Sequence, residues 1–207
     1  MAEPLYPLLS LSRLRMGTDG QGVTTLVGGA GCPLSCRWCL NAKYLRDRKA
    51  EPVTAAELYR RVKIDDLYFQ ATGGGVTFGG GEVLLHADFI REFRKHCCSA
   101  WRITVETSLH VPRDSVEAAA EAVDEFIIDI KDTDPEIYRR YTGGDVSLVL
   151  EHLRFLLDAL GPERLLVRVP LIPDYNTADD QARSVDRLRA MGVTRLDVFS
   201  YIRREAE

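Results

Sequence analysis

The stretch GCPLSCRWCLN, residues 31–41, follows a short β-branched run and contains three of the five cysteines. These are Cys32, Cys36 and Cys39, at the spacing Cys-x3-Cys-x2-Cys. Three thiolates so close in sequence can hold an iron–sulfur cluster, but a [4Fe–4S] cube takes four ligands. One iron would therefore keep an open position for a further ligand. The spacing predicts a catalytic cluster rather than one that only transfers electrons.

A structural zinc site is the alternative interpretation of these cysteines. Zinc sites usually combine two paired half-sites, whereas only Cys36 and Cys39 form such a pair here. The bacterial ferredoxin pattern has two residues in its first gap, so a three-residue gap differs from it. The remaining cysteines, Cys97 and Cys98, are adjacent at the end of a predicted helix and are interpreted as incidental thiols.

Composition predicts one globular domain that spans residues 1–207, with 45% hydrophobic and 28% charged residues. The net charge of -4 argues against nucleic-acid binding through bulk electrostatics. No run approaches the ~20 apolar residues of a membrane helix, and the amino terminus lacks the basic start of a signal peptide. A cytoplasmic location is the default expectation, and it favours metal binding over disulfides for the cysteines.

Six short runs of apolar, β-branched or aromatic residues predict strands. Their near-continuous apolar character is typical of parallel strands that are covered on both faces. The predicted strands are Val23–Val27, Gly75–Phe78, Arg102–Thr107, Glu125–Ile130, Leu165–Pro170 and Arg195–Tyr201.

Helix-start signals alternate with these strands. Capping boxes are predicted at Thr54 and Asp114, and Asp134 precedes a first-turn proline. Further helices are expected over residues 87–98, 147–160 and 177–191. Such βα repeats wind right-handed, and both an open doubly wound sheet and a partial (β/α)6 TIM-type barrel satisfy them. The cysteine loop after the first strand favours the partial barrel, because sites on this fold collect at the carboxyl ends of the strands.

The glycine-rich stretch GGGVTFGGGE, residues 73–82, ends the second predicted strand. Glycines allow a ligand to approach the backbone closely, and the absence of a following Gly-Lys-Ser/Thr argues against a P-loop. With the cysteine spacing, this stretch resembles the radical S-adenosylmethionine (SAM) enzymes. Their Cys-x3-Cys-x-aromatic-Cys signature matches residues 32–39, and their Gly-Gly-Glu motif matches Gly80, Gly81 and Glu82.

Several further segments are similar to one branch of these enzymes, the glycyl radical enzyme activating enzymes such as pyruvate formate-lyase activating enzyme. The matching segments are residues 18–22, 72–85, 129–131, 141–143 and 168–173. They indicate a short form of the family without a ferredoxin-like insert. The resemblance departs at Ile202, where the family commonly has a histidine near the nucleoside.

The resemblance implies a role for each matching residue. Cys32, Cys36 and Cys39 would ligate the cluster, and Trp38 would lie against the adenine of SAM. The Gly-Gly-Glu motif would bind the amino group of the methionine moiety. Lys131 suits the SAM carboxylate as a point charge.

The other candidate site residues lie on or beside the predicted strands and the cysteine loop. Glu106 and Thr107 stand where the family has Asp-Thr, and Glu106 and Asp129 are expected to help hold a monovalent cation. Arg168 is a charge within an apolar run, and it is expected to face the site because a buried arginine needs a partner. Asp19 and Tyr141 match positions near the substrate opening. Asn41 is either a support for the site or a simple turn residue.

The family chemistry implied is reductive cleavage of SAM by a [4Fe–4S] cluster, which gives methionine and a 5′-deoxyadenosyl radical. Flavodoxin or ferredoxin would supply the electron, and the radical would abstract hydrogen from a glycine of a glycyl radical enzyme. Two alternatives stay open. One is a radical SAM oxidoreductase of the same fold that acts on a peptide, an RNA or a metabolite, or that cleaves SAM alone. The other is a non-enzymatic module that binds zinc or a cluster.

Overall fold

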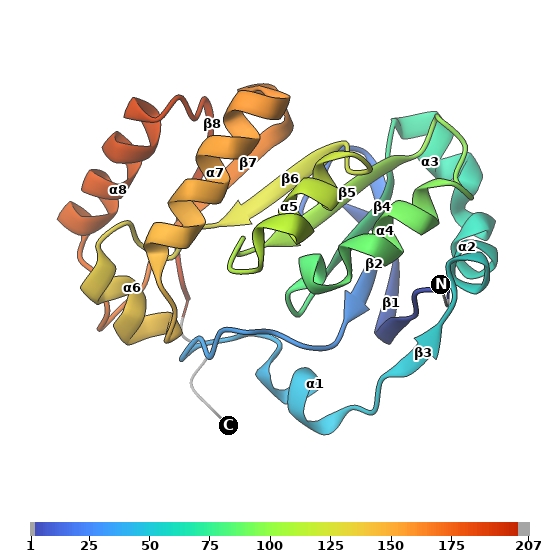
Figure 1. Cartoon of the computed structure of the whole chain (residues 1–207), viewed down its shortest axis with the longest axis horizontal. Helices are drawn as coiled ribbons and strands as arrows, with labels where there is room; N and C mark the ends of the chain where they lie inside the picture. Colours follow the sequence, from blue (N-terminus) through green and yellow to red (C-terminus); the bar gives the residue numbers. More distant parts are fainter. Residues whose placement is uncertain (1–2, 203–207) are drawn as a thin grey trace.

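A computed structural model describes residues 3–202 (Figure 1). An eight-stranded sheet has the order β3-β1-β2-β4-β5-β6-β7-β8. Its six neighbouring parallel strands confirm the six predicted from sequence, with ends within two residues of those expected. They are β2 (Val23–Gly29), β4 (Gly75–Gly80), β5 (Arg102–Thr107), β6 (Glu125–Asp129), β7 (Leu165–Leu171) and β8 (Arg195–Ser200).

Two further strands, which the sequence analysis did not predict, extend the sheet at its amino-terminal edge. β1 (Tyr6–Met16) pairs antiparallel with β2 and with the short β3 (Glu51–Val53). The pairing of β1 with β2 shifts register twice, and Leu14 adopts a positive φ of 54°. These irregularities disrupt the alternation of apolar and polar residues by which a strand is recognised.

The helices lie on one side of the sheet and at its ends, with α4, α5 and α7 in front of the strands in Figure 1. β3 and β8 are the two edges, so the sheet is curved around a core but not closed into a barrel. This agrees with the predicted partial barrel. The helices are α1 (Ala42–Asp47), α2 (Ala55–Val62), α3 (Asp66–Thr72), α4 (Ala87–Arg94), α5 (Arg113–Ala120), α6 (Pro135–Thr142), α7 (Val146–Leu160) and α8 (Ala178–Ala190). Three 3-10 turns are η1 (Lys63–Asp65), η2 (Val83–His86) and η3 (Pro162–Arg164).

Most predicted helix starts are confirmed. Thr54 forms a complete capping box with Glu57, and the Asp134 side chain accepts two backbone hydrogen bonds at the start of α6. The prediction at Asp114 is wrong: α5 begins after Pro112, and no side chain caps it. α7 begins one residue before the predicted Ser147, with Asp145 as its cap.

Large apolar side chains pack between the helices and the sheet. Tyr6 of β1 stacks on Phe89 with 5.0 Å between ring centroids and meets the edge of Phe78 at 5.5 Å. β1 is held a second time through Asp65 of η1, which is fully buried. The Asp65 carboxylate accepts hydrogen bonds from Arg13 Nε at 2.9 Å and Thr25 Oγ1 at 2.7 Å.

The connection between β1 and β2, residues 17–22, crosses the inner face of the sheet. Thr77 Oγ1 donates to the Asp19 carbonyl at 2.5 Å, and Arg168 Nη2 donates to the Thr18 carbonyl at 2.7 Å. Gly20 has a positive φ of 109°, and an added Cβ would lie 3.0 Å from Thr104 Oγ1, so glycine is favoured there. We call this connection, residues 17–22, the floor loop, because it lies beneath the hollow side of the sheet. Among the helices described, none is long and apolar enough to span a membrane.

Candidate active site

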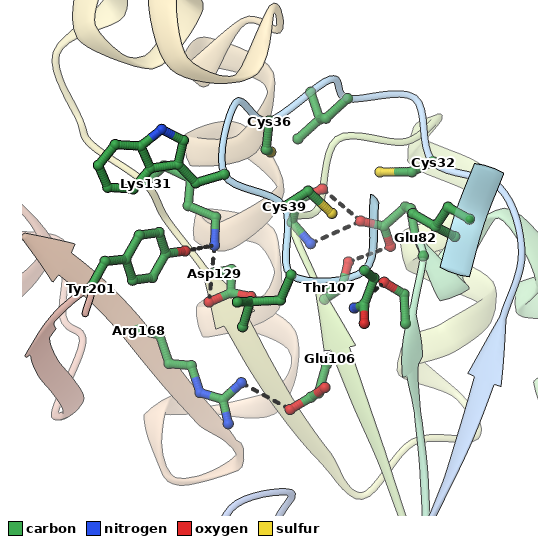
Figure 2. Close-up of a pocket in the computed structure, with 18 of the residues that line it drawn as sticks. Cys32, Cys36, Cys39, Glu82, Glu106, Thr107, Asp129, Lys131, Arg168 and Tyr201 are labelled. Atoms are coloured by element: carbon green, nitrogen blue, oxygen red, sulfur yellow. Dashed lines mark hydrogen bonds and ion pairs between the residues drawn. The ribbon is translucent and has the colours of Figure 1, made fainter. Parts of the chain in front are cut away.

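A cavity of about 490 Å³ lies at the carboxyl ends of the parallel strands, between the strand ends and the cysteine loop (Figure 2). Its volume is within the range of pockets that bind small molecules and cofactors. The cavity is lined by all twelve residues that the sequence analysis singled out: Cys32, Cys36, Trp38, Cys39, Gly80, Gly81, Glu82, Glu106, Thr107, Asp129, Lys131 and Arg168. Tyr141, which was matched through the resemblance, and Asn41 also line it. Asp19, which was expected near the substrate opening, is buried in the connection between β1 and β2 and is not among the residues that line the cavity.

The three cysteines lie along the loop that connects β2 to α1. Cys32 is exposed, whereas Cys36 and Cys39 are half-buried, and Cys39 N donates to the Cys36 carbonyl at 3.3 Å. Burial raises the pKa of the Cys36 thiol to about 11, and Lys131 is the main influence that lowers it. Within residues 3–202, no group of three His, Cys, Asp or Glu side chains could hold a single metal ion.

The glycine turn after β4 packs its backbone against the cysteine loop. Gly81 N donates to the Gly29 carbonyl at 3.0 Å, and Glu82 N donates to the Gly31 carbonyl at 2.8 Å. A Cβ on Gly81 would lie 2.2 Å from that Gly31 oxygen, so only glycine fits. The Asn41 side chain also donates to the Gly80 carbonyl at 2.8 Å, which favours a supporting role for Asn41 over that of a simple turn residue.

The Glu82 carboxylate is buried beneath this turn, where it meets the end of β5. It accepts hydrogen bonds from Thr107 Oγ1 at 2.6 Å, from Ser108 N at 2.8 Å and from Ser108 Oγ at 2.6 Å. Burial raises the pKa of Glu82, and the bonds from Ser108 and Thr107 oppose that rise. Ser108 was missed by sequence reasoning, although it directly follows a strand whose last two residues were singled out.

Lys131 extends into the cavity just beyond β6, as Figure 2 shows. Its Nζ donates to the Tyr201 hydroxyl at 2.9 Å and lies 3.4 Å from Asp129 Oδ1. Burial alone would lower the pKa of Lys131, but Asp129 and Tyr201 together raise it above its usual range. The side chain is therefore a fixed positive charge in a sheltered position. Tyr201 ends the last predicted strand, but no motif in the sequence indicated its contact with Lys131.

Arg168 lies lower in the cavity, toward the floor loop. The strand register places Arg168 beside Asp129 on one side and Asp197 on the other. Its Nη1 forms an ion pair with Glu106 Oε1 at 2.9 Å, and its Nε lies 3.7 Å from Asp197. Burial raises the pKa of Glu106, and Arg168 counteracts it. The two carboxylates expected at a monovalent cation, Glu106 and Asp129, thus each lie beside a cationic side chain.

The rings of Trp38 and Tyr141 line one wall of the cavity, and Tyr175 packs against both. Trp38 meets the edge of Tyr175 with 6.0 Å between ring centroids, and Tyr175 meets the edge of Tyr141 at 4.9 Å. Tyr175 belongs to the connection between β7 and α8, a segment from which no site residue was predicted. This wall offers flat apolar surface beside the cysteines, which suits a planar ring.

The residues present fit both an iron–sulfur cluster and SAM. Three thiols supply the soft sulfur ligands that such clusters take. A sheltered lysine is matched in charge to the carboxylate of an amino acid, and the backbone carbonyls of the glycine turn can accept hydrogen bonds from its amino group. The cavity therefore brings the three thiols together with groups that suit an amino acid.

Comparison with known proteins agrees with this chemistry. The sequence model of the Radical SAM superfamily matches residues 26–184. The pyruvate formate-lyase 2-activating enzyme of Escherichia coli (strain K12) is 29% identical over 216 residues, covering 88% of this chain and 73% of that protein. The (2S)-3-sulfopropanediol dehydratase activating enzyme of Klebsiella oxytoca is 34% identical over 125 residues. That match covers 60% of this chain and 39% of that protein.

Among solved structures, SuiB of Streptococcus suis matches with a TM-score of 0.66 at 15% identity. The match covers 86% of this chain and 40% of SuiB, so the chain spans about two fifths of the length of that structure. At this identity the likeness concerns the fold alone, and it agrees with the curved sheet seen here. Because the superfamily model matches more than half of the residues, the chain belongs to the radical SAM superfamily.

Proposed function

We propose that the protein activates a glycyl radical enzyme by abstracting hydrogen from a glycine of that partner. One observation carries this proposal: the three cysteines, the glycine turn and the charged strand ends line a single cavity. The names of the relatives supply the substrate class, since they are activating enzymes for pyruvate formate-lyase, choline trimethylamine-lyase and similar enzymes. Flavodoxin or ferredoxin is the proposed electron donor.

In this proposal Cys32, Cys36 and Cys39 hold a [4Fe–4S] cluster and SAM occupies the cavity. When bound, the two groups supply reductive cleavage of SAM to methionine and a 5′-deoxyadenosyl radical that abstracts hydrogen. The backbone of the glycine turn, above the Glu82 carboxylate, receives the amino group of SAM. Lys131 pairs with the carboxylate of SAM.

The remaining cavity residues orient the bound groups and limit the entry of water. Trp38 provides a flat surface for the adenine ring. Arg168 and Glu106, paired with each other, fix the floor loop beneath the cavity. Because these charged groups are already paired, they need little rearrangement when ligands bind, which is how a site orients a reactive group without admitting solvent.

The decisive experiment is anaerobic reconstitution with iron and sulfide, followed by addition of SAM and dithionite. We expect 5′-deoxyadenosine in the chromatogram of the wild-type reaction and none with Cys36→Ala. A Cys97→Ser variant, altered outside the cavity, serves as the matched cysteine control and should retain activity. If the wild-type protein binds zinc and forms no cluster, the proposal fails.

A second step tests the substrate class. The reconstituted enzyme is incubated with SAM, reductant and a purified glycyl radical enzyme, with pyruvate formate-lyase and choline trimethylamine-lyase as the first candidates, and the mixture is examined by electron paramagnetic resonance (EPR). A glycine-centred radical signal supports activation. Production of 5′-deoxyadenosine without such a signal would point to the alternative, a radical SAM enzyme with another substrate.

A further inference from the structure

The last turn of α6 is bonded directly to the cysteine loop. Ser35 N donates to the Thr142 carbonyl at 2.9 Å, and Arg37 N donates to the Tyr141 carbonyl at 3.1 Å. The final carbonyls of a helix have no partner within the helix, so they are free to accept bonds from elsewhere. Here both partners are loop residues, and they flank Cys36 on either side. The position of Cys36 is therefore fixed by a helix end that is distant in sequence.

Two glycines after this turn allow the loop to approach so closely. Gly143 has a positive φ of 77°, and a Cβ there would lie 2.9 Å from Ser35 Oγ. At Gly144 a Cβ would lie 2.5 Å from Leu34 Cδ2. Both distances are shorter than ordinary carbon contacts. A methyl group at Gly143 would therefore force the Ser35 side chain to move, and one at Gly144 would displace the end of the Leu34 side chain and meet His110 Nε2 at 3.0 Å.

The helix end itself is held rigidly. Thr142 Oγ1 donates to the Tyr138 carbonyl at 2.8 Å and accepts a bond from Gly144 N at 3.0 Å. Tyr138, Tyr141 and Thr142 are all buried. The eight-residue helix is about 12 Å long and begins four residues after Lys131. One βα unit thus carries both the cavity lysine and the turn that holds Cys36.

We infer that residues 141–144 form a positioning element for the cluster, here called the α6 clamp. It holds Cys36 at the cavity through the two backbone bonds, and Gly143 and Gly144 are positioning residues because they leave room for the loop. The inference rests on the proposed function in one respect, since it takes Cys36 as a cluster ligand. It also gives a role to Gly143 of the segment Tyr141-Thr142-Gly143. This segment resembles the family, but its glycine does not line the cavity that would hold the proposed ligands.

The test compares two left-handed glycines at helix ends. Gly143→Ala places a methyl group against Ser35. Gly73→Ala is the matched control: Gly73 ends α3 with a φ of 67° and a ψ of 25°, and its Cβ would meet only the end of the Gln21 side chain, at 3.3 Å. Both variants incur the strain of a left-handed alanine. Only Gly143→Ala disturbs the loop, and the double variant Ser35→Ala/Gly143→Ala removes the atom that it strikes.

Two measurements report how firmly the cysteine loop is held. In the metal-free protein, trypsin cleavage after Arg37, identified by mass spectrometry, should be several-fold faster in Gly143→Ala than in Gly73→Ala. After anaerobic reconstitution, the chelator concentration that removes half of the iron should fall about 10-fold in Gly143→Ala, and the EPR spectrum of the reduced cluster should change. The double variant should recover in both readouts. If Gly143→Ala equals Gly73→Ala in both, the α6 clamp is overturned.

A variant that fails to fold and a wild-type protein that binds zinc are each resolved by a further measurement. If Gly143→Ala does not fold, Gly144→Ala decides, because that position has no left-handed φ and its methyl group would meet Leu34; wild-type behaviour of that variant in both readouts would overturn the inference. If the wild-type protein takes up zinc and no cluster, the proposed function fails. The relative cleavage rates of the metal-free variants would still show whether α6 holds the loop.

Discussion

The carboxylate of Asp65 illustrates how a single buried residue supports the cavity from a distance. It joins Arg13 of β1 to Thr25 of β2, and these two strands lead into and out of the floor loop. The hydrogen bonds from Arg13 and Thr25 outweigh burial and lower the pKa of Asp65. Although Asp65 contacts no proposed ligand, the floor of the cavity depends on the strands that it joins.

We expect Asp65→Asn to lower the free energy of unfolding at pH 7 by about 1–3 kcal/mol, because an amide cannot satisfy the same donors. Because Arg13 is half-exposed, solvent screens its share of this contribution. Because the pKa of Asp65 is lower in the folded protein than in the unfolded chain, its ionised carboxylate stabilises the fold above the unfolded-state pKa of about 4. This stabilisation is lost as the carboxylate becomes protonated in acid. The difference between the variant and the wild type, measured by urea denaturation, should therefore shrink below about pH 4.

Asp88→Asn is the control for this measurement, because Asp88 is exposed on α4 and pairs only at the surface. Its effect should stay within about 0.5 kcal/mol. A loss at Asp65→Asn that is equally small, or that is independent of pH, would contradict the role given to the carboxylate.

For single residues, the sequence was enough to predict which side chains belong to the site but not which partners they contact. All twelve predicted site residues line the cavity, because eleven lie in the cysteine loop or at a strand end and Arg168, a charge in the middle of β7, faces the same side of the sheet. Their partners could not be predicted. Ser108 meets Glu82, Tyr201 meets Lys131, and Asp197 meets Arg168. Each of these contacts arises only from the curvature and register of the sheet. No pattern within a single segment encodes such contacts.

Among the elements, two helix starts with similar sequence signals behave differently. Thr54 accepts a hydrogen bond from Glu57 N at 3.2 Å, and the Glu57 side chain accepts one from Thr54 N at 2.8 Å. Asp114, in contrast, lies inside the first turn of α5 after Pro112. Proline had already fixed the start of that helix, so the capping box is not formed.

We therefore expect Thr54→Ala to destabilise the protein by about 1 kcal/mol, and Asp114→Ala to change stability by less than about 0.5 kcal/mol. Thermal unfolding of the two variants side by side measures the difference. Equal destabilisation would show that Asp114 stabilises α5 in a way that its hydrogen bonds do not reveal.

The same scale explains why β1 and β3 were missed while the six parallel strands were found. A buried parallel strand is a short apolar run that is visible without knowledge of its neighbours. β1 carries Ser10, Ser12 and Arg13 within its length and shifts register against β2 at two places. Its strand character comes from pairing with β2 and β3, which is a property of the assembled sheet.

For the whole molecule, stability should be graded from the centre of the sheet to the cysteine loop. β4, β5 and β6 are paired on both sides and largely buried, whereas α1 has no buried residue. In the metal-free protein, amide hydrogen exchange should be slowest in β4–β6 and fastest in α1.

Anaerobic reconstitution with iron, sulfide and SAM should then slow exchange in residues 31–45 and leave α2 and α3 unchanged. Mass spectrometry of peptic fragments measures both states. Slower exchange throughout the chain, with no preference for this segment, would indicate that the ligands act on global stability instead of on the cavity.

The bond from Arg168 to the Thr18 carbonyl joins residues 150 positions apart in the chain. During synthesis on the ribosome, Arg168 emerges long after the three cysteines. The floor loop cannot reach its final position until most of β7 has been translated, and the cysteine loop likewise waits for the end of α6. The nascent chain therefore carries its thiols without their enclosure for most of translation. Insertion of the cluster belongs after chain completion, and rapid translation through β7 would shorten the interval in which those thiols are open to oxidation.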